Sequence, residues 1–428
     1  MRKKVCMFVW NHFTNDARVM RECIALSEDN YSVDLICIED PNDKSLPLYE
    51  EKNSNFRVTR VKRYPQTLKL FQKAYRVCFS NKLRIILSMI VWLLSLYLAP
   101  ILTIVLTTSI LLLLKTKLKT VFIRGSIILR MIAKGLQKDY EIYHSNDLNT
   151  LTQGFICSKI RFRKRKLIYD SHEVQTSRTG YNSSLYGKLE NFFIDKLDVM
   201  IVENHTRAEY NEELYGFYPS VVYNYPFKQM QNLVEKVNLH KILSIPPNEK
   251  ILLYQGGIQT GRGLNKLIEA VPLFTEGVLV FIGDGKIKRE LEEMVKNRNL
   301  EEKVKFIPKV PLEKLPAYTK NAYLGFQVLN NVCFNHYSAS SNKLFEYIMA
   351  GVPVIACEFP EIKKVVEENE VGICVDSHSH KSIADGVNLL LKNQDLRRKY
   401  SENTNQAKNK YNWENEKRNF LQVYSSIS

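Results

Sequence analysis

The stretch Ser340–Ile355, with the sequence SSNKLFEYIMAGVPVI, predicts a helix followed by a buried strand. Asn342 or the serines before it can cap the helix, its apolar residues recur on one face, and Gly351 can end it in a left-handed conformation. Val352–Ala356 then has the unbroken apolar character of a strand inside a parallel sheet. The stretch therefore indicates one α/β unit.

Two charged residues of this helix can carry chemistry. Lys343 lies in the first turn, where free backbone N–H groups and the positive end of the helix dipole favour a bound phosphate. Glu346 follows one turn later, where its carboxylate can accept hydrogen bonds from a sugar diol. An ordinary amphipathic helix with a surface Lys and Glu explains the same pattern, and this stretch alone does not decide between the two.

Two further segments repeat the arrangement of a strand that ends in a glycine loop. Ile251–Arg262, ILLYQGGIQTGR, is an apolar strand running into such a loop and an arginine, and a helix over Gly263–Ala270 follows. Val278–Ile282 is another buried strand, which ends at Gly283-Asp284-Gly285. One strand–loop–helix turn is weak evidence for phosphate binding, but three in this order are stronger evidence for it.

The composition fits two α/β domains. A chain of 428 residues, 45% of them hydrophobic, is long enough for two cores of ordinary size. Strand-like stretches alternate with helical ones, which predicts parallel sheets. The eight cysteines are scattered without a CxxC pair, which indicates reduced thiols in a cytosolic setting rather than disulfides or a zinc site.

A basic and strongly apolar insert, residues 65–138, interrupts the first domain. No Asp or Glu occurs between Arg57 and Lys138, and the core 85–114 carries no charge, with Pro100 at its middle. As one helix this core would be about 45 Å long, against a hydrocarbon layer about 30 Å thick. The strands before and after it belong to one sheet, so both basic flanks should lie on the cytoplasmic side.

These conditions predict a re-entrant or interfacial helical hairpin on the cytoplasmic face of the cell membrane, attracted to anionic lipid. A helix pair buried inside the first domain is the alternative. The formal net charge is +16, and the basic run Lys159–Lys166 could suggest nucleic acid. No aromatic platform or nucleic-acid motif accompanies that run, so we expect no nucleic-acid partner.

The order and spacing of several motifs resemble those of retaining GT-B glycosyltransferases of glycosyltransferase family 4. The motifs are NHFTNDARVMR, HSNDLNTL, LIYDSHE, VYNYP, GGIQTGRGL, FIGDG and SNKLFEYIMAGVPVIA. The resemblance spans nearly the whole chain except roughly residues 65–138. It implies two Rossmann-like domains facing a cleft: an acceptor-side domain over 1–226, a nucleotide-sugar domain over 227–405, and a helix over 406–428 that crosses back to the first domain.

The resemblance also implies roles for single residues. Arg262 matches a family cation, usually lysine, that binds the donor diphosphate, Glu346 matches the glutamate that holds the ribose hydroxyls, and His172 matches a histidine that faces the donor sugar. A lone histidine is more often structural, which is the competing interpretation. The implied donor-binding residues are Gly256, Gly257, Gly263, Gly283, Asp284, Gly285, Ser338, Ser340, Ser341, Asn342 and Lys343. The implied acceptor-side residues are Asn15, Asp16, Arg18, Asp147 and Glu173, and a helix-capping role competes for Asp16.

The chain departs from the family pattern at two positions. A second family arginine falls at Gly257, where Lys343 or Lys266 can take over its charge, and we favour Lys343. The first of two family glutamates, which sits by the donor sugar, falls at Ser338. Serines and backbone N–H groups would then line the sugar pocket, and the identity of the sugar stays open.

These features together predict a membrane-associated glycosyltransferase. It would move a sugar from a nucleotide-diphospho-sugar to a lipid-linked saccharide in capsule, O-antigen or exopolysaccharide assembly, and the resemblance implies retention of configuration. The sequence has no DxD motif and no His/Asp cluster at metal spacing, so no essential metal and no other cofactor are expected. A sugar-nucleotide epimerase of the same fold and an inactive membrane-anchored partner subunit are the alternatives.

Overall fold

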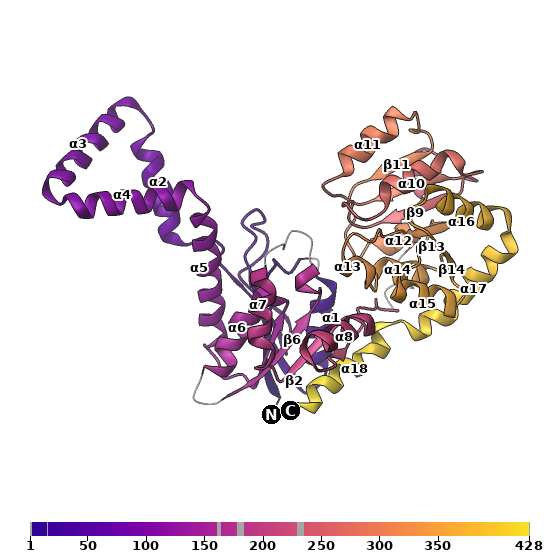
Figure 1. The fold of residues 1–428 in the computed structure, drawn as a ribbon, viewed down its shortest axis with the longest axis horizontal. Helices are drawn as coiled ribbons and strands as arrows, with labels where there is room; N and C mark the ends of the chain where they lie inside the picture. Colours follow the sequence, from indigo (N-terminus) through magenta and orange to yellow (C-terminus); the bar gives the residue numbers. More distant parts are fainter. Residues whose placement is uncertain (1, 15, 161–163, 178–183, 229–234, 428) are drawn as a thin grey trace. The chain divides into compact units, whose positions relative to one another are not determined.

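The computed structural model describes residues 2–14, 16–160, 164–177, 184–228 and 235–427, and its chain forms two compact units (Figure 1). Unit 1 comprises Met1–Asp170 and Lys196–Asp198, and unit 2 comprises Ser171–Asp195 and Val199–Ser428. The sequence predicts a domain boundary near residue 226, whereas the compact units divide after Asp170. One reason is a set of hydrogen bonds, described below, that join Val174, Asn204 and Arg207 to Asn335 and Ser338.

Apart from the polar edge strand Tyr49–Asn53, unit 1 is built on parallel strands with buried, largely apolar sequences. The strands are β1 (Lys3–Phe8), β2 (Tyr31–Ile38), β3 (Tyr49–Asn53), β4 (Phe56–Val61), β5 (Ile142–Asn146) and β6 (Lys166–Ser171). They follow the order β3-β4-β2-β1-β5-β6, and the order of this sheet ends with β7 (Val199–Val202) and β8 (Ser220–Val221). All of these strands except β3 and β8 are predicted by runs in the sequence, namely Val5–Trp10, Val33–Ile38, Arg57–Val61, Ile142–His144, Lys166–Tyr169 and Val199–Val202. Strand β3 pairs antiparallel with β4.

Helices join the strands of unit 1 in the manner of a Rossmann-like fold. They are α1 (Ala17–Glu28), α2 (Gln66–Cys78), α3 (Lys82–Leu98), α4 (Pro100–Lys115), α5 (Leu118–Gly135) and α6 (Leu148–Lys159). The second half of α5 packs on the sheet, since Ile127, Met131 and Ile132 are buried. A side chain at Gly135 would collide with Phe8 and Cys157, which shows how closely α5 approaches β1 and α6.

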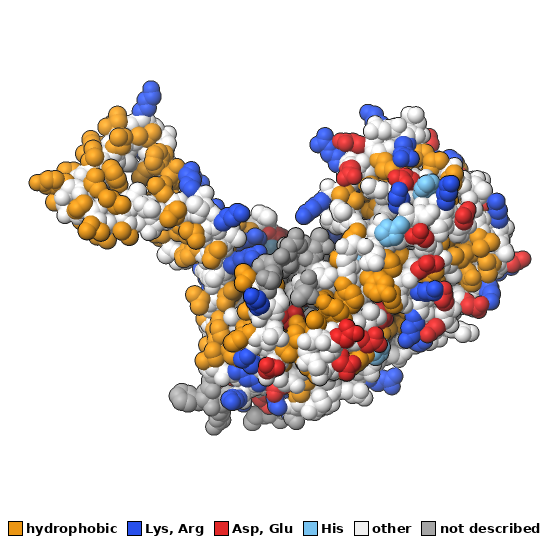
Figure 2. Space-filling model, in the orientation of Figure 1, with side chains coloured by type: hydrophobic (Ala, Val, Ile, Leu, Met, Phe, Trp, Pro, Cys, Tyr) orange, Lys and Arg blue, Asp and Glu red, His pale blue; other side chains and the backbone are white. Residues whose placement is uncertain are grey.

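The first half of the insert stands apart from this core. As predicted, residues 85–114 form two helices that meet at Pro100, which is the first residue of α4. Neither α3 nor α4 buries a single residue, and hydrophobic side chains cover both helices (Figure 2). A helix pair buried inside the domain, the alternative interpretation, is therefore wrong.

The length and composition of the helices show which of them could cross a bilayer. In the described part of the chain, no single helix has both the length and the apolar character needed to cross a membrane. Two pairs reach that length only together: α2 with α3, bent by 114°, and α4 with α5, bent by 85°.

Unit 2 contains a six-stranded parallel sheet in the order β11-β10-β9-β12-β13-β14. Its strands are β9 (Ile251–Gln255), β10 (Val278–Ile282), β11 (Val304–Ile307), β12 (Leu324–Gln327), β13 (Val354–Cys357) and β14 (Gly372–Val375). Alternate residues of each strand enter two apolar clusters, for example Leu253 in one and Leu252 in the other. Because both faces are buried under helices, the strands read as continuous apolar runs.

The helices of unit 2 include α10, α13 and α14, which begin near the loops that end the strands. Its helices are α7 (Ser184–Ile194), α8 (His205–Tyr215), α9 (Leu239–Leu243), α10 (Leu264–Ala270), α11 (Lys288–Asn297), α12 (Leu315–Thr319), α13 (Phe334–Tyr337), α14 (Asn342–Ala350), α15 (Pro360–Glu368), α16 (His380–Lys392), α17 (Gln394–Lys410) and α18 (Trp413–Ser426).

The expected C-terminal helix is two helices. Asn412 interrupts the run and caps α18 by accepting a hydrogen bond from the Asn415 N–H. Within unit 2, the N–H of buried Trp413 donates to the Pro226 carbonyl over 3.0 Å, and Glu416 accepts from the Tyr223 N–H over 2.9 Å. The chain after residue 410 is therefore fixed to the segment that follows β8.

Candidate functional site

Two cations act on one another at the loop that follows β9. Lys343 is the second residue of α14, and its side chain lies against Gly256: a Cβ atom on Gly256 would stand 3.2 Å from the lysine Cδ and 3.5 Å from its Nζ. Arg262 follows in the same loop, and among the described residues its buried Nε has no hydrogen-bond partner. We call Gly256, Arg262 and Lys343 the cationic cluster.

The two charges of the cationic cluster oppose one another. Burial, followed by repulsion from Arg262, lowers the pKa of Lys343 to about 7, while Glu346 acts in the other direction. The ring centre of Tyr254 lies 5.5 Å from the lysine Nζ. A bound anion would relieve this repulsion, so the cluster favours a ligand with more than one negative charge.

The loop after β10 closes against the loop after β9. Gly283 adopts φ +151°, and a Cβ there would stand 2.0 Å from the Gly256 carbonyl oxygen, so only glycine fits. The Asp284 carboxylate accepts the Lys309 N–H over 3.0 Å and pairs with Lys288 over 2.9 Å. These two contacts, the backbone one first, hold the pKa of Asp284 below its usual range. Asp284 thus shapes this loop.

The other glycines predicted at the donor site also shape loops. The Gly257 carbonyl accepts the Tyr254 hydroxyl over 2.9 Å. Gly263, with φ +70°, is the N-cap residue of α10. Gly285 lies directly against the Ile258 carbonyl. The predicted glycines therefore shape the two loops that follow β9 and β10, and of these Gly256 contacts Lys343.

The carboxylate of Glu346 is held by a buried polar pair. The Gln255 amide nitrogen donates to Glu346 over 2.6 Å, and the Gln255 carbonyl oxygen accepts the Thr319 hydroxyl over 2.7 Å. Gln255 is fully buried at the end of β9. Gln255 is not among the residues predicted from the sequence, although a polar residue at the end of the apolar run ILLYQ is a usable signal.

The start of α14 matches the prediction in part. Ser341 is the N-cap residue but makes no side-chain capping bond, while Gly351 ends the helix in the left-handed conformation with φ +77°. Ser340 is buried and Asn342 is exposed. Because the first N–H groups of a helix have no partner within it, those of α14 suit an anion beside Lys343.

Ser338 does not face open space. The sequence predicts Ser338 at the sugar pocket, but its side chain is wholly buried. Its hydroxyl donates to the Phe334 carbonyl over 2.8 Å and accepts from Arg207 Nε over 3.2 Å, and its carbonyl accepts from Asn204 over 2.7 Å. Ser338 is buried because residues of α13, of α8 and of the N-cap of α8 already bond its hydroxyl and its carbonyl. A contact of Ser338 with a donor sugar stays a prediction.

Arg207 of α8, which the sequence analysis missed, joins several of these segments. Besides Ser338, its guanidinium donates to the His172 carbonyl over 2.6 Å and to Glu203 over 2.6 Å. Nothing in the local sequence distinguishes it from a surface arginine of a polar helix. Its four-way contact, which includes the Asn335 carbonyl at 3.4 Å, appears only in the folded chain.

The segment that carries His172 is tied to α13 by its backbone. The Val174 N–H donates to the Asn335 side chain over 2.7 Å, and the Asn335 amide donates back to the Val174 carbonyl over 3.0 Å. The His172 and Glu173 side chains are partly exposed. The structure therefore brings the His172 backbone together with Ser338 in unit 2, while the roles of both side chains stay predictions.

His336 is a further residue that the sequence analysis missed. Its ring packs on Gly261, and its Nδ1 lies 3.2 Å from the Asn330 carbonyl. Burial, followed by repulsion from Arg262, lowers the pKa of His336. A neutral imidazole therefore stands next to the cationic cluster.

The predicted acceptor-side residues of unit 1 are mostly engaged in the fold. Asp16 caps α1 by accepting the Val19 N–H over 3.1 Å, so the competing capping role is present. Arg18 is buried and forms a two-pronged ion pair with Asp170. Asp147 is the N-cap residue of α6 and is partly exposed. Asn15 lies outside the described residues.

The Arg18 ion pair belongs to a buried polar cluster that sequence spacing did not reveal. Glu22, His144 and Asp170 come from three separate elements, and their potential ligand atoms lie within 4.8 Å of one another. Spacing along the sequence gives no sign of this cluster, because only the fold brings the three residues together, and the expectation of no essential metal stays a prediction. The Arg18 guanidinium is 3.0 Å from Glu22 and 2.8 Å from Asp170, so both carboxylates already face a cation.

Comparison with known sequences supports a sugar-transfer chemistry. Residues 235–407 match the family Glycosyl transferases group 1. An uncharacterized glycosyltransferase of Methanocaldococcus jannaschii is 24% identical over 308 residues, covering 65% of this chain and 72% of that protein. The putative colanic acid biosynthesis glycosyl transferase WcaI of Escherichia coli is 29% identical over 174 residues, covering 39% and 42%.

A further relative is named for a lipid-linked substrate. The N-acetylgalactosamine-N,N'-diacetylbacillosaminyl-diphospho-undecaprenol 4-alpha-N-acetylgalactosaminyltransferase of Campylobacter jejuni is 25% identical over 170 residues, covering 39% of this chain and 44% of that protein. This alignment and the one to WcaI span less than half of either relative.

Solved structures share the fold along the whole chain. Sucrose-phosphate synthase of Thermosynechococcus elongatus superposes with a TM-score of 0.73 at 17% identity, covering 100% of this chain and 99% of that one. Anabaena HepE in complex with UDP superposes with a TM-score of 0.69 at 14% identity, covering 99% and 100%. The architecture is therefore the two-domain, Rossmann-like GT-B fold. Residues 235–407 form a glycosyltransferase group 1 domain, and the chain is a glycosyltransferase.

Proposed function

We propose that this glycosyltransferase transfers a sugar, with retention of configuration, from a nucleotide-diphospho-sugar to a lipid-linked saccharide in bacterial surface-polysaccharide assembly. The observation that carries the donor assignment is the cationic cluster: Lys343 lies against Gly256, and Arg262 of the same loop is near enough to repel its charge and lower the pKa of the lysine. A diphosphate supplies negative charge that would neutralise these two cations. The UDP complex of HepE, which has the same fold, supports a nucleotide ligand.

The proposed role of each donor residue follows from its place. Arg262 and Lys343 neutralise the diphosphate as it leaves, which is the charge that develops during the transfer. Glu346, held by Gln255, accepts hydrogen bonds from the ribose hydroxyls. His172 faces the donor sugar. Because the leaving group is stabilised by protein cations and helix N–H groups, the proposal needs no divalent metal.

The lipid-linked acceptor is supported by the exposed helices of the insert. Leu98 and Ile101 are 80% and 79% exposed, and Tyr97 is 87% exposed, which is a large apolar surface for a protein in water. Polar groups between α3 and α4 pair with each other: Trp92 donates to Thr107 over 3.0 Å, and Thr103 donates to the Ser95 carbonyl over 2.9 Å. Internal pairing of this kind is what a lipid environment requires. The name of WcaI, a putative colanic acid biosynthesis enzyme, supports the surface-polysaccharide role, and the diphospho-undecaprenol in the name of the Campylobacter enzyme supports the lipid-linked acceptor.

The donor assignment is tested by thermal unfolding of the purified chain with a panel of nucleotide-diphospho-sugars. A ligand that binds only the native state raises the unfolding temperature. We expect one nucleotide class to stabilise the wild type and to have little effect on Arg262→Ala. Equal stabilisation of both, or of neither, would contradict the assignment.

Turnover separates the proposed enzyme from its alternatives. An epimerase of the same fold would convert the bound donor without an acceptor, whereas the proposed transferase needs the lipid-linked saccharide. An inactive partner subunit would bind no nucleotide sugar.

A further inference from the structure

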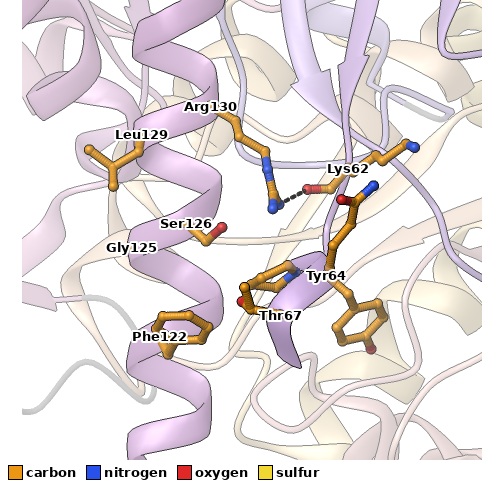
Figure 3. Close-up of a pocket in the computed structure, with 10 residues that line it drawn as sticks. Lys62, Tyr64, Thr67, Phe122, Gly125, Ser126, Leu129 and Arg130 are labelled. Carbon is orange, nitrogen blue, oxygen red and sulfur yellow. Dashed lines mark hydrogen bonds between the residues drawn. The ribbon is translucent and has the colours of Figure 1, made fainter. Parts of the chain in front are cut away.

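A cavity of about 570 Å³ lies in unit 1, at the base of the exposed helices (Figure 3). One wall is the segment after β4, which contributes Lys62, Tyr64 and Thr67 to the lining. The other wall is α5, which contributes Phe122, Gly125 and other residues through Arg130. Its volume falls in the range of ordinary ligand pockets.

The cavity is apolar with a basic margin. Phe122, Leu129 and Pro65 supply apolar surface, while Lys62 and Arg130 supply positive charge. Figure 3 shows Arg130 extending from α5 toward the Lys62 backbone, where its guanidinium donates to the Lys62 carbonyl over 2.7 Å. Neither side chain forms an ion pair within the described chain segments, and no acidic residue occurs anywhere in 64–138.

A second cavity, of about 510 Å³, adjoins the first. The two share Lys62 and Arg130, so these cations stand at the common wall. The second cavity adds Lys134 and Lys138, of which Lys138 is already paired with Asp34 over 2.8 Å. Positive charge is therefore concentrated at one end of the apolar cavity.

The apolar end continues into the exposed surface of the insert. Phe122 and Leu129 are 39% and 68% exposed, and α5 follows directly on α4, whose side chains are not buried. A ligand that fits both ends has an anionic head and a long hydrocarbon chain. Charge complementarity and continuity with the apolar helices favour a membrane lipid over a soluble phosphate.

We propose that this cavity binds the phosphate head and the first chain segment of the lipid-linked acceptor, with Lys62 and Arg130 at the phosphate and Phe122 along the chain. The inference rests on the proposed function and names the lipid phosphate as the recognised part of the acceptor. It assigns these residues to acceptor positioning, apart from the donor cluster of unit 2.

Gly125 offers a way to fill the cavity without disturbing the core. A Cβ atom at Gly125 would meet no heavy atom within 4 Å, and Gly125 lines the cavity. Gly125→Leu therefore places a side chain in the cavity, while Gly125→Ala is the control that changes helix propensity in the same direction without filling it.

The test is photo-crosslinking of the full chain, in detergent micelles, with a polyprenyl phosphate that carries a diazirine on its first isoprene unit. We expect Gly125→Leu to lower the crosslinking yield roughly tenfold and Gly125→Ala to leave it near wild type. Lys62→Gln should lower it, while Arg124→Gln, which removes an exposed charge of α5 outside the cavity, should not.

Competition identifies the ligand. Unlabelled polyprenyl phosphate should abolish the crosslink, whereas the matching polyprenol without phosphate and phosphatidylglycerol should compete weakly. Equal competition by phosphatidylglycerol, or equal yields from Gly125→Leu and Gly125→Ala, would overturn the proposal. Stabilisation by the donor, measured on the same variants, should be unchanged, so that failure at this cavity is distinguishable from failure of the proposed function.

Discussion

At the scale of single residues, the main feature is the pair of positive charges in the cationic cluster. Arg262 lacks a partner for its buried Nε among the described residues, and Lys343 is held near its point of deprotonation. Neither feature stabilises the empty protein, because burying a charge without a partner costs free energy. A bound anionic ligand would offset this cost in free energy, because it supplies the opposite charge.

Removal of Arg262 tests this interpretation. Arg262→Ala should lower the rate of transfer by roughly 10²-fold or more, because one cation at the leaving diphosphate is lost. Lys266→Ala is the matched control, since Lys266 lies in the next helix but is already paired with Glu269 over 2.7 Å. Steady-state kinetics should show near-normal transfer for Lys266→Ala, and similar losses in both variants would contradict the role of Arg262.

The pKa of Lys343 predicts a pH dependence of donor binding. With a pKa of about 7 in the free protein, Lys343 loses its proton as the pH rises, and a bound diphosphate raises the pKa again. Above pH 7 binding must therefore take up a proton, so the affinity should fall by up to about tenfold per pH unit, and below pH 7 it should be level.

Calorimetry in buffers of different ionisation enthalpy measures this proton uptake directly. The nucleotide sugar is a suitable ligand because its phosphate diesters do not titrate in this range. Lys343→Arg, which keeps its charge at every pH used, should bind without proton uptake. A pH-independent affinity in the wild type would show that Lys343 does not meet the diphosphate.

Single residues were predictable where a local motif carries them. Arg262, Lys343 and Glu346 follow strand–loop–helix signals that can be read along the chain. Arg207 and the buried cluster around His144 were not predictable, because their partners lie far away in the sequence and only the fold joins them.

At the scale of elements, α8 and α13 are joined through Arg207. Its guanidinium satisfies Ser338, the His172 carbonyl and Glu203 at once. Arg207→Ala should lower the free energy of unfolding by about 3 kcal/mol, because buried polar groups and a carboxylate lose their partner.

Denaturant unfolding of two variants measures this contribution. Arg289→Ala is the control, because Arg289 is 90% exposed and pairs with Glu293 one turn away. Its effect should stay within about 0.5 kcal/mol. Equal stability of the two variants would show that the Arg207 network contributes nothing measurable.

Elements were predicted well where apolar runs are unbroken. The parallel strands and the hairpin at Pro100 follow from hydrophobic runs and from proline. The edge strand β3, with the polar sequence YEEKN, gives no such signal. The buried half of α5 was also not separable from the exposed helices, because both are apolar and basic; burial of Met131 depends on the sheet it meets.

At the scale of the whole molecule, the insert should bring the enzyme to a membrane. The full chain should float with vesicles that contain anionic lipid, and high salt should release it only in part, since salt screens the basic flanks but not the apolar contact. The double substitution Leu98→Asp and Ile101→Asp places charges on this surface and should abolish flotation, while Leu273→Asp, at another exposed position, should not. Flotation of the first variant would contradict the interfacial role of α3 and α4.

Transfer of a radiolabelled sugar into bacterial lipid extract tests the central claim most directly. The purified chain, incubated with each member of a nucleotide-sugar panel and the extract, should move label from one donor into the organic phase. EDTA should leave the rate unchanged, and Arg262→Ala should abolish most of it. Label that stays in the aqueous phase for every donor, or transfer that stops with EDTA and returns with added metal, would contradict the proposed metal-independent transfer to a lipid-linked acceptor.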